Sequence, residues 1–169
     1  MHFLTPTECR DWCTSARTAV DTQGIPVRPH HSTHNARANI PRDFTHILRF
    51  CQGLERSLRP YRGCLLWVTA SDIWESGVNW HLYYRMRQSY GDLRQLNEAP
   101  GHVFLAHEVA DFVTFIEIAA LSGFDAHLVT DSTACARAFI SHDEFVEFTA
   151  DDHNPELVRE FTIAIESGT

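Results

Sequence analysis

DAHLVTDSTACARAFISHDEFVEFTA, residues 125–150, contains three short apolar runs with turn-forming residues between them. The first run is followed by Asp, Ser and Thr, and the second ends at the polar pair His142 and Asp143. Such residues favour tight turns because their short polar side chains hydrogen-bond to nearby backbone groups. We therefore expect three short strands, with turns near residues 132–135 and at residues 142–143.

Two further segments are predicted to be strands. Residues 64–69, CLLWVT, form a short apolar run that is rich in strand-forming residues and indicates a buried strand. In residues 80–87, WHLYYRMR, Trp, Leu, Tyr and Met alternate with more polar residues, a period of two. This period is typical of a strand with one buried face and one exposed face.

Four segments are predicted to be helices. The first begins at a capping box, with Thr5 as the N-cap, Pro6 as the first helical residue and Glu8 closing the box. The other three cover residues 43–59, 106–121 and 154–166. Residues 106–121 are apolar on nearly every side, so this helix is expected to be the most buried.

These elements predict an α+β fold in a single globular domain spanning residues 1–169. Their order indicates a mostly antiparallel sheet of about five strands packed with about four helices. Residues 21–41 are rich in Gly, Pro, Ser, Thr, Asn and His without any period, which predicts a long irregular loop.

Three histidines in this loop, His30, His31 and His34, offer imidazoles that could bind a metal ion. Their spacing matches neither the H-E-x-x-H motif nor a zinc finger, and a loop without a rigid frame cannot hold a coordination geometry. We therefore predict no metal and no cofactor, and these histidines are only weak metal candidates.

The five cysteines indicate a reducing compartment. Their number is odd and no C-x-x-C pair is present, so free and mostly buried thiols are expected. The first residues lack the features of a signal peptide, and no window approaches the ~18 consecutive apolar residues of a membrane span. We expect a cytoplasmic protein that does not contact a membrane.

Charge is distributed unevenly along the chain. All 14 basic residues are arginines, so the chain has no lysine. Residues 1–100 hold 12 arginines and 9 acidic residues, whereas residues 101–169 hold 2 arginines and 13 acidic residues. An acidic C-terminal part disfavours nucleic acid as its partner, because phosphates require a basic surface. It favours a basic protein.

The acidic residues are most concentrated in residues 143–156, which lie within the stretch SHDEFVEFTADDHNPE, residues 141–156. Three interpretations are open: a solvated strand edge, an acidic docking surface, or catalytic or metal-binding carboxylates. If this is a docking surface, the expected contact residues are His142, Asp143, Glu144, Glu147, Asp151 and Asp152.

An alternative binding surface lies in residues 81–90, HLYYRMRQSY, where arginines are interleaved with tyrosines, as in proteins that stack on bases and bind phosphates. Its candidate contact residues are His81, Tyr83, Arg85 and Arg87. The simpler interpretation is the exposed face of an amphipathic strand.

Motifs for catalysis are absent from the sequence. Cys135, Ser141, His142 and Asp143 could be combined into a nucleophile with a base, but no G-x-S-x-G context supports such a set, and a Walker A motif requires lysine. No catalytic residue is therefore predicted.

The sequence thus favours a binding protein over an enzyme. Its most concrete interpretation is a bacterial immunity or antitoxin-like inhibitor that blocks a basic toxin or effector protein. The alternatives are a small cytosolic hydrolase or metal-dependent enzyme that uses His, Asp or Glu, and an RNA-binding module that uses residues 81–90.

Overall fold

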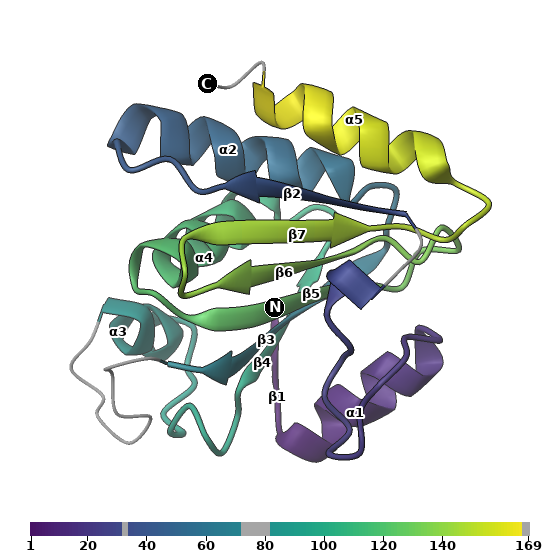
Figure 1. The fold of residues 1–169 in the computed structure, drawn as a ribbon. Coiled ribbons are helices and arrows are strands. Elements are labelled where there is room, and N and C mark those ends of the chain that lie inside the picture. Colours follow the sequence, from purple (N-terminus) through teal and green to yellow (C-terminus); the bar gives the residue numbers. More distant parts are fainter. Residues whose placement is uncertain (32–33, 72–81, 167–169) are drawn as a thin grey trace.

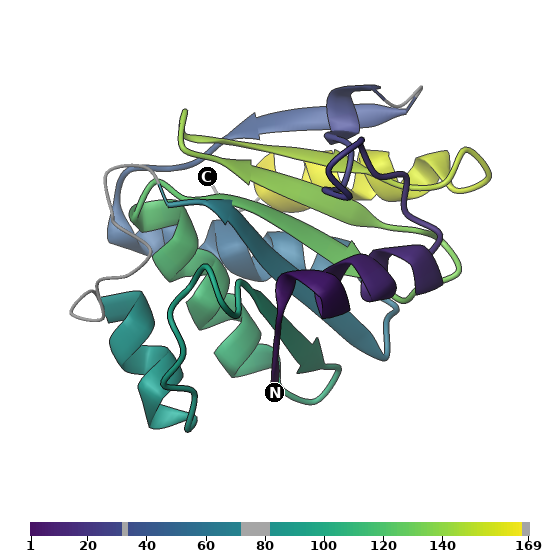
Figure 2. The same ribbon diagram turned by 90° about the horizontal axis from the view of Figure 1, so that it is seen from below.

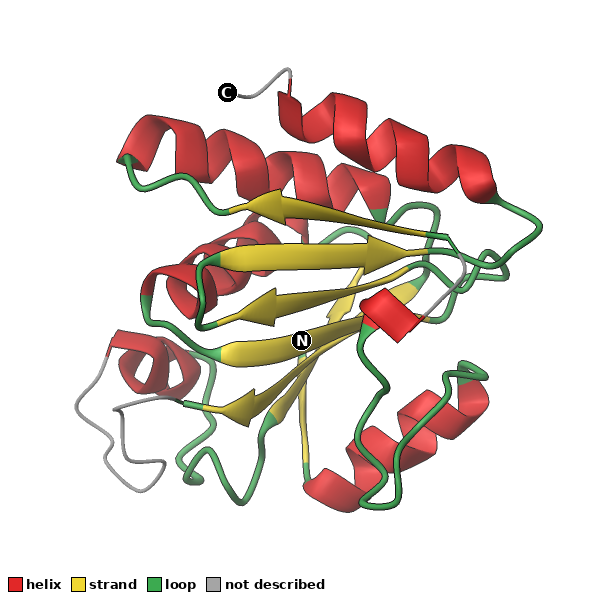
Figure 3. Ribbon diagram, viewed as in Figure 1, coloured by secondary structure: helices red, strands yellow, loops and turns green. Residues whose placement is uncertain are grey.

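An antiparallel sheet of seven strands forms the centre of the fold, in a computed structural model that describes residues 1–31, 34–71 and 82–166. In these residues five α-helices pack against the sheet (Figures 1 and 3). The strands are β1 (His2–Leu4), β2 (Asn35–Asn39), β3 (Gly63–Ala70), β4 (Gly101–Leu105), β5 (Asp125–Thr130), β6 (Arg137–Ser141) and β7 (Phe145–Thr149). Their order in the sheet is β1-β4-β3-β5-β6-β7-β2.

The helices are α1 (Pro6–Ser15), α2 (Phe44–Ser57), α3 (Leu82–Ser89), α4 (Val109–Leu121) and α5 (Pro155–Glu166), and a short 3-10 helix, η1, covers Pro29–His31. The α+β class and the antiparallel sheet are confirmed. The described residues contain more strands and helices than predicted, because β1, β2, β4 and α3 were not expected. None of the helices in these residues is long and apolar enough to cross a membrane.

Two sequence predictions are wrong about local structure. The predicted strand at residues 80–87 is helix α3, apart from residues 80 and 81, which lie outside the described residues. The predicted loop at residues 21–41 contains η1 and the edge strand β2. β2 has the sequence NARAN, which carries no strand signal of its own, and pairing with β7 determines its conformation.

The main core lies between one face of the sheet and helices α2, α3, α4 and α5. Alternate residues of the central strands point into it, among them Leu66, Leu128, Ile140 and Phe148. Phe148 stacks on Phe161 of α5, with ring centroids 4.8 Å apart. Because these side chains are apolar, the helices pack on this face and exclude water from it.

On the opposite face, the described residues place one α-helix. α1 covers one end of it (Figure 2). There, Cys9 and Cys13 pack against Leu65, Val103 and Val129. Its N-terminus has the predicted capping box between Thr5 and Glu8. All five cysteines are unpaired; four are buried and Cys135 is partly exposed.

Beyond α1 the same face carries both polar and aromatic side chains. Trp67, His127, Phe139, Glu147 and Arg37 are consecutive partners in the strand register and form one row across the sheet. Because direct partners point to the same face, polar side chains are brought next to one another over the sheet surface. The segment that contains η1 crosses this row and covers part of it.

Candidate functional site

The acidic residues that are neighbours in sequence lie at two ends of β7. His142, Asp143 and Glu144 form the turn between β6 and β7, whereas Asp151 and Asp152 follow the other end of β7. The five residues of β7 separate the two groups by roughly 17 Å, at about 3.4 Å per residue. The predicted acidic surface is therefore divided.

The β6–β7 turn holds its side chains in one geometry. The Glu144 N–H donates to the Ser141 carbonyl at 3.1 Å, and the Asp143 N–H donates to the Ser141 hydroxyl at 3.2 Å. Glu144 has a φ of 63°, the left-handed conformation that closes a three-residue hairpin loop. The backbone thus determines the direction in which Asp143 and Glu144 project.

Asp125, at the start of β5, anchors this turn. Its Oδ1 accepts hydrogen bonds from the His142 backbone N–H at 3.0 Å and from His142 Nδ1 at 2.9 Å. Arg28 lies 3.6 Å from Oδ2 of the same carboxylate. Asp125 is buried whereas the His142 side chain is half-exposed, so this contact connects the turn to the interior. The other ring nitrogen of His142 lies 3.5 Å from Asp143.

Arginines neutralise part of the charge at this end. Arg42 Nε donates to the Glu144 carboxylate at 3.0 Å, and Arg28 offsets the charge of Asp125. The Asp143 side chain is 68% exposed and makes no ion pair with an arginine among the described residues. Asp143 is therefore the main uncompensated charge of the turn.

Glu147 lies away from the acidic surface that the sequence predicted. Its side chain is only 7% exposed, because it points onto the polar row beneath η1, where its Oε2 lies 3.0 Å from His30 Nδ1. The expectation that Glu147 is exposed beside the other acidic residues is wrong.

The second acidic group continues into α5. Asp151 and Asp152 precede the helix, and Glu156 and Glu160, four residues apart, lie on one side of it. These four carboxylates form no ion pair with any residue in the described ranges. Figure 1 shows α5 at the outside of the molecule, beside α2.

A cavity of about 340 Å³ opens beside Asp151 and Asp152. Its charged and reactive lining comes from separate segments: Arg17, His31, Cys135, Arg137, Asp151 and Asp152. Burial lowers the pKa of Arg137. The cavity thus joins members of the acidic cluster, the histidine loop and the cysteines, which sequence reasoning had treated as unrelated.

The three loop histidines have different surroundings. The ring of His30 contacts Glu147 and packs on His31 with centroids 3.9 Å apart, whereas the His34 carbonyl accepts a hydrogen bond from the Thr149 hydroxyl. Among the described residues, no group of three His, Cys, Asp or Glu side chains is placed to hold a metal ion. The lack of a native metal site remains a prediction.

The alternative surface at residues 81–90 is largely internal. Tyr83 and Arg87 are 0% and 1% exposed, so the prediction that they face solvent is wrong. Helical geometry turns both residues toward the sheet, since they lie four positions apart. Arg85 is exposed, and His81 lies outside the described residues. Of the candidate residues in this segment that the structure describes, Arg85 is the exposed one.

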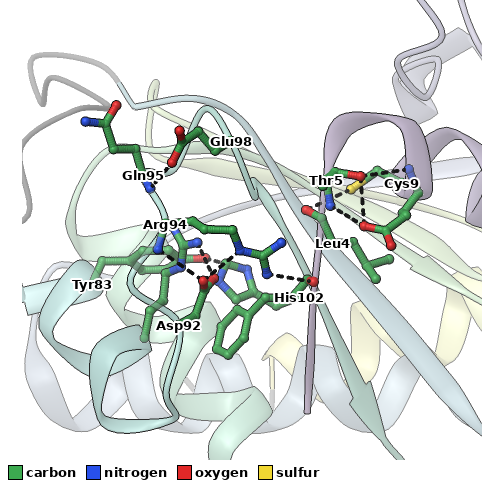
Figure 4. A network of polar contacts seen from close by, with 12 residues as sticks. Leu4, Thr5, Cys9, Tyr83, Asp92, Arg94, Gln95, Glu98 and His102 are labelled. Atoms are coloured by element: carbon green, nitrogen blue, oxygen red, sulfur yellow. Dashed lines mark hydrogen bonds and ion pairs between the residues drawn. The ribbon is translucent and has the colours of Figure 1, made fainter.

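Tyr83 and Arg87 belong to a buried polar network, part of which Figure 4 shows. The Tyr83 hydroxyl lies 3.1 Å from His102 Nδ1, and Arg87 donates to Asp92 at 2.6 Å. Burial lowers the pKa of His102 well below its usual value, and nearby Arg87 adds to this effect. Burial opposes ionisation of Asp92, but hydrogen bonds from Arg94 and Arg87 outweigh it and lower its pKa. The network holds α3 on the sheet.

The residues considered for nucleophilic catalysis are not brought together. Cys135 precedes β6, whereas Ser141 and His142 lie at the other end of that strand. The Ser141 side chain is buried and its hydroxyl already accepts the Asp143 N–H. The geometry therefore offers no nucleophile beside the half-exposed His142.

Sequence reasoning did not single out Arg28, Asp125 or His127. A signal was present in β5, because Asp125 and His127 are two residues apart and so lie on one face of the strand. Arg28 gave no such signal, since its position over Phe139, 4.2 Å from the ring centroid, depends on the path of the loop.

Comparison of the chain with models of protein families, with curated proteins and with solved structures gives no match. The function is therefore argued from the chemistry of the site alone.

Proposed function

We propose that this protein is a protein-binding domain, most concretely an immunity or antitoxin-like inhibitor, which docks a basic toxin or effector on the acidic surface of α5. The docking residues are Asp151, Asp152, Glu156 and Glu160. Asp143 at the β6–β7 turn forms a second, smaller contact. Such an inhibitor acts in the cytoplasm, where it blocks its partner by covering it.

One observation carries the proposal: the four carboxylates at α5 have no ion-pair partner among the described residues, whereas several acidic residues on the rest of the surface are paired with arginine. Glu144 contacts Arg42, Asp125 contacts Arg28, and Asp131 contacts Arg62. Uncompensated surface charges of one sign attract and orient an oppositely charged partner before contact, which raises the association rate.

The alternatives have less support in the geometry. An enzyme needs a nucleophile, a base or a metal site in one place, and the described residues bring Cys135 and His142 to opposite ends of β6. An RNA-binding surface at residues 81–90 needs exposed aromatic and basic side chains, and Tyr83 and Arg87 are buried.

Two double variants with equal charge changes test the docking surface. Asp152→Asn with Glu156→Gln neutralises the α5 surface, and Asp143→Asn with Glu144→Gln is the matched control at the turn. The partner is the basic protein encoded beside this chain's gene, and its association is measured at low salt. We expect the α5 variant to associate about 10-fold more slowly, and the control to change the rate less.

The inhibitor role needs a second measurement. Equimolar addition of the chain should abolish the activity of the partner. Association of the α5 variant at the parent rate would locate binding elsewhere, and a fully active partner in the saturated complex would contradict inhibition.

A further inference from the structure

β2 is an edge strand of the sheet. Its register partner is β7, and among the described residues no strand pairs with its other side (Figure 2). The strand is five residues long, and alternate side chains are exposed. An edge of this length presents a row of backbone hydrogen-bonding groups to solvent.

The direction of these backbone groups follows from one hydrogen bond. The Ile40 N–H donates to the Glu144 carbonyl at 2.9 Å, so the backbone groups of Ala36 and Ala38, which have the same parity, point toward β7. The N–H and C=O groups of Arg37 and Asn39 consequently point away from the sheet. No residue in the described ranges hydrogen-bonds to them.

The opposite edge of the sheet is protected. β1 has only three residues, and the Phe3 carbonyl accepts a hydrogen bond from Arg94 at 3.1 Å. Short strands and arginine contacts of this kind prevent unwanted strand pairing. β2 lacks such a contact at Arg37 and Asn39 within the described residues, so its edge is the one available for pairing.

A groove of about 490 Å³ lies along this edge, between β2 and α5. Ala36 lines it from the strand, and Val158, Arg159, Thr162 and Ile163 line it from the helix. Ile163 is 52% exposed, a large apolar side chain at the surface. A strand added to β2 would therefore have an apolar wall on the helix side.

The charge of Arg37 determines which side chains suit the other face of an added strand. A residue opposite Arg37 would place its side chain on the polar face, beside the Arg37 guanidinium, which lies 3.5 Å above the Phe145 ring centroid. Arg37 and Arg159 make no ion pair with the described residues. A carboxylate suits the position opposite Arg37, while apolar side chains suit the positions opposite Ala36 and Ala38, which face α5.

We infer that the β2 edge binds an extended peptide segment of a partner by strand addition, with apolar residues facing α5 and acidic residues facing Arg37. Backbone hydrogen bonds to Arg37 and Asn39 supply affinity, and the alternating side chains supply specificity. This edge is distinct from the carboxylates of the proposed docking surface. A second copy of the chain fits less well, because symmetric pairing about Arg37 places two guanidinium groups opposite each other.

A heptapeptide of alternating valine and glutamate, blocked at both ends, serves as the probe for the isotope-labelled full chain. Amide resonances of Arg37 and Asn39 should shift on titration, and their hydrogens should become protected from exchange with water. The amides of Ala36 and Ala38 should already be protected in the free protein. A peptide of alternating valine and lysine should bind more weakly, and Arg37→Glu should reverse this preference.

The matched variants are Asn39→Pro and Asn39→Ala. Both remove the Asn39 side-chain amide, but only proline removes the outward backbone N–H, and it leaves the β2–β7 bonds intact, as edge positions allow. Loss of one backbone hydrogen bond should weaken peptide binding about 10-fold for Asn39→Pro relative to Asn39→Ala. Equal affinities, unchanged exchange at Arg37 and Asn39, or a dimer already paired through β2 would each overturn the inference.

Discussion

His142 is joined to Asp125 by two hydrogen bonds, one from its backbone N–H at 3.0 Å and one from its Nδ1 at 2.9 Å, both to the same carboxylate oxygen. Asp125 is buried and begins β5, which lies next to β6 in the sheet. The two hydrogen bonds therefore attach the β6–β7 turn to β5. The conformation of the turn therefore depends on a residue far from it in sequence.

Asp125→Asn should lower the free energy of unfolding by about 1–3 kcal/mol, because the amide keeps one acceptor but loses the negative charge that faces Arg28 and His142. Urea denaturation measures this change. Asp143→Asn is the matched control: its exposed carboxylate should contribute less than about 0.5 kcal/mol. Equal stabilities for the two variants would show that Asp125 is no anchor.

Stability should depend on the protonation of His127. Burial, helped by nearby Arg28, lowers the pKa of this histidine from 6.5 to about 3. Between these values the unfolded chain binds a proton that the folded protein does not, so this contribution is complete above pH 6.5 and is lost as pH falls toward 3. The free energy of unfolding should therefore decrease on acidification.

His127→Gln should remove this dependence. Between about pH 4 and about pH 5.5, the slope of unfolding free energy against pH should fall by about 1.4 kcal/mol per pH unit relative to the parent chain. The slope is informative even if the variant is less stable at every pH. A slope for the His127 variant that equals the slope of the parent chain would contradict the prediction.

Cys135 should be the only thiol that reacts rapidly in the native protein. Burial raises the pKa of Cys13 to about 12 and raises the pKa values of Cys9, Cys51 and Cys64 as well, which suppresses their thiolates. Titration with a chromogenic disulfide should detect one thiol before unfolding and all five after it. Cys135→Ser should abolish the rapid phase; its persistence would show that one of the four buried thiols reacts in the native protein.

Gly101 allows α1 to approach the sheet. A Cβ atom at this position in β4 would meet Cys9 Sγ at less than contact distance and would lie 3.1 Å from Leu65 Cδ1. Gly101→Ala should therefore destabilise the protein by about 1–3 kcal/mol. Combining it with Cys9→Ala removes the obstructing sulfur, so the double variant should lose at least about 0.5 kcal/mol less than the two single effects together. Strict additivity in thermal or urea unfolding would contradict this packing.

Local signals were sufficient for several elements. The capping box predicts the start of α1, and the runs in residues 125–150 predict β5, β6 and β7 with both turns. These predictions succeed because caps, apolar periodicity and turn residues act over a few positions.

The alternation in residues 80–87 predicted a strand with Tyr83 and Arg87 on its exposed face, but both residues are buried. Arg87 can be buried because Asp92, in the loop that follows α3, pairs with it. A single window of sequence contains no information on such a partner. The polar strand β2 was missed for the same reason: β7 supplies its hydrogen bonds.

The sequence by itself determined the α+β class, four of the helices, the three-strand meander and the acidic character of the C-terminal part. Only the tertiary structure decided which of those acids remain available. β7 separates Asp143 from Asp152, and η1 covers Glu147. Among the described residues, β2 is an edge strand with one side unpaired. Sequence proximity does not decide this, because a strand directs successive side chains to opposite faces and carries its two ends far apart.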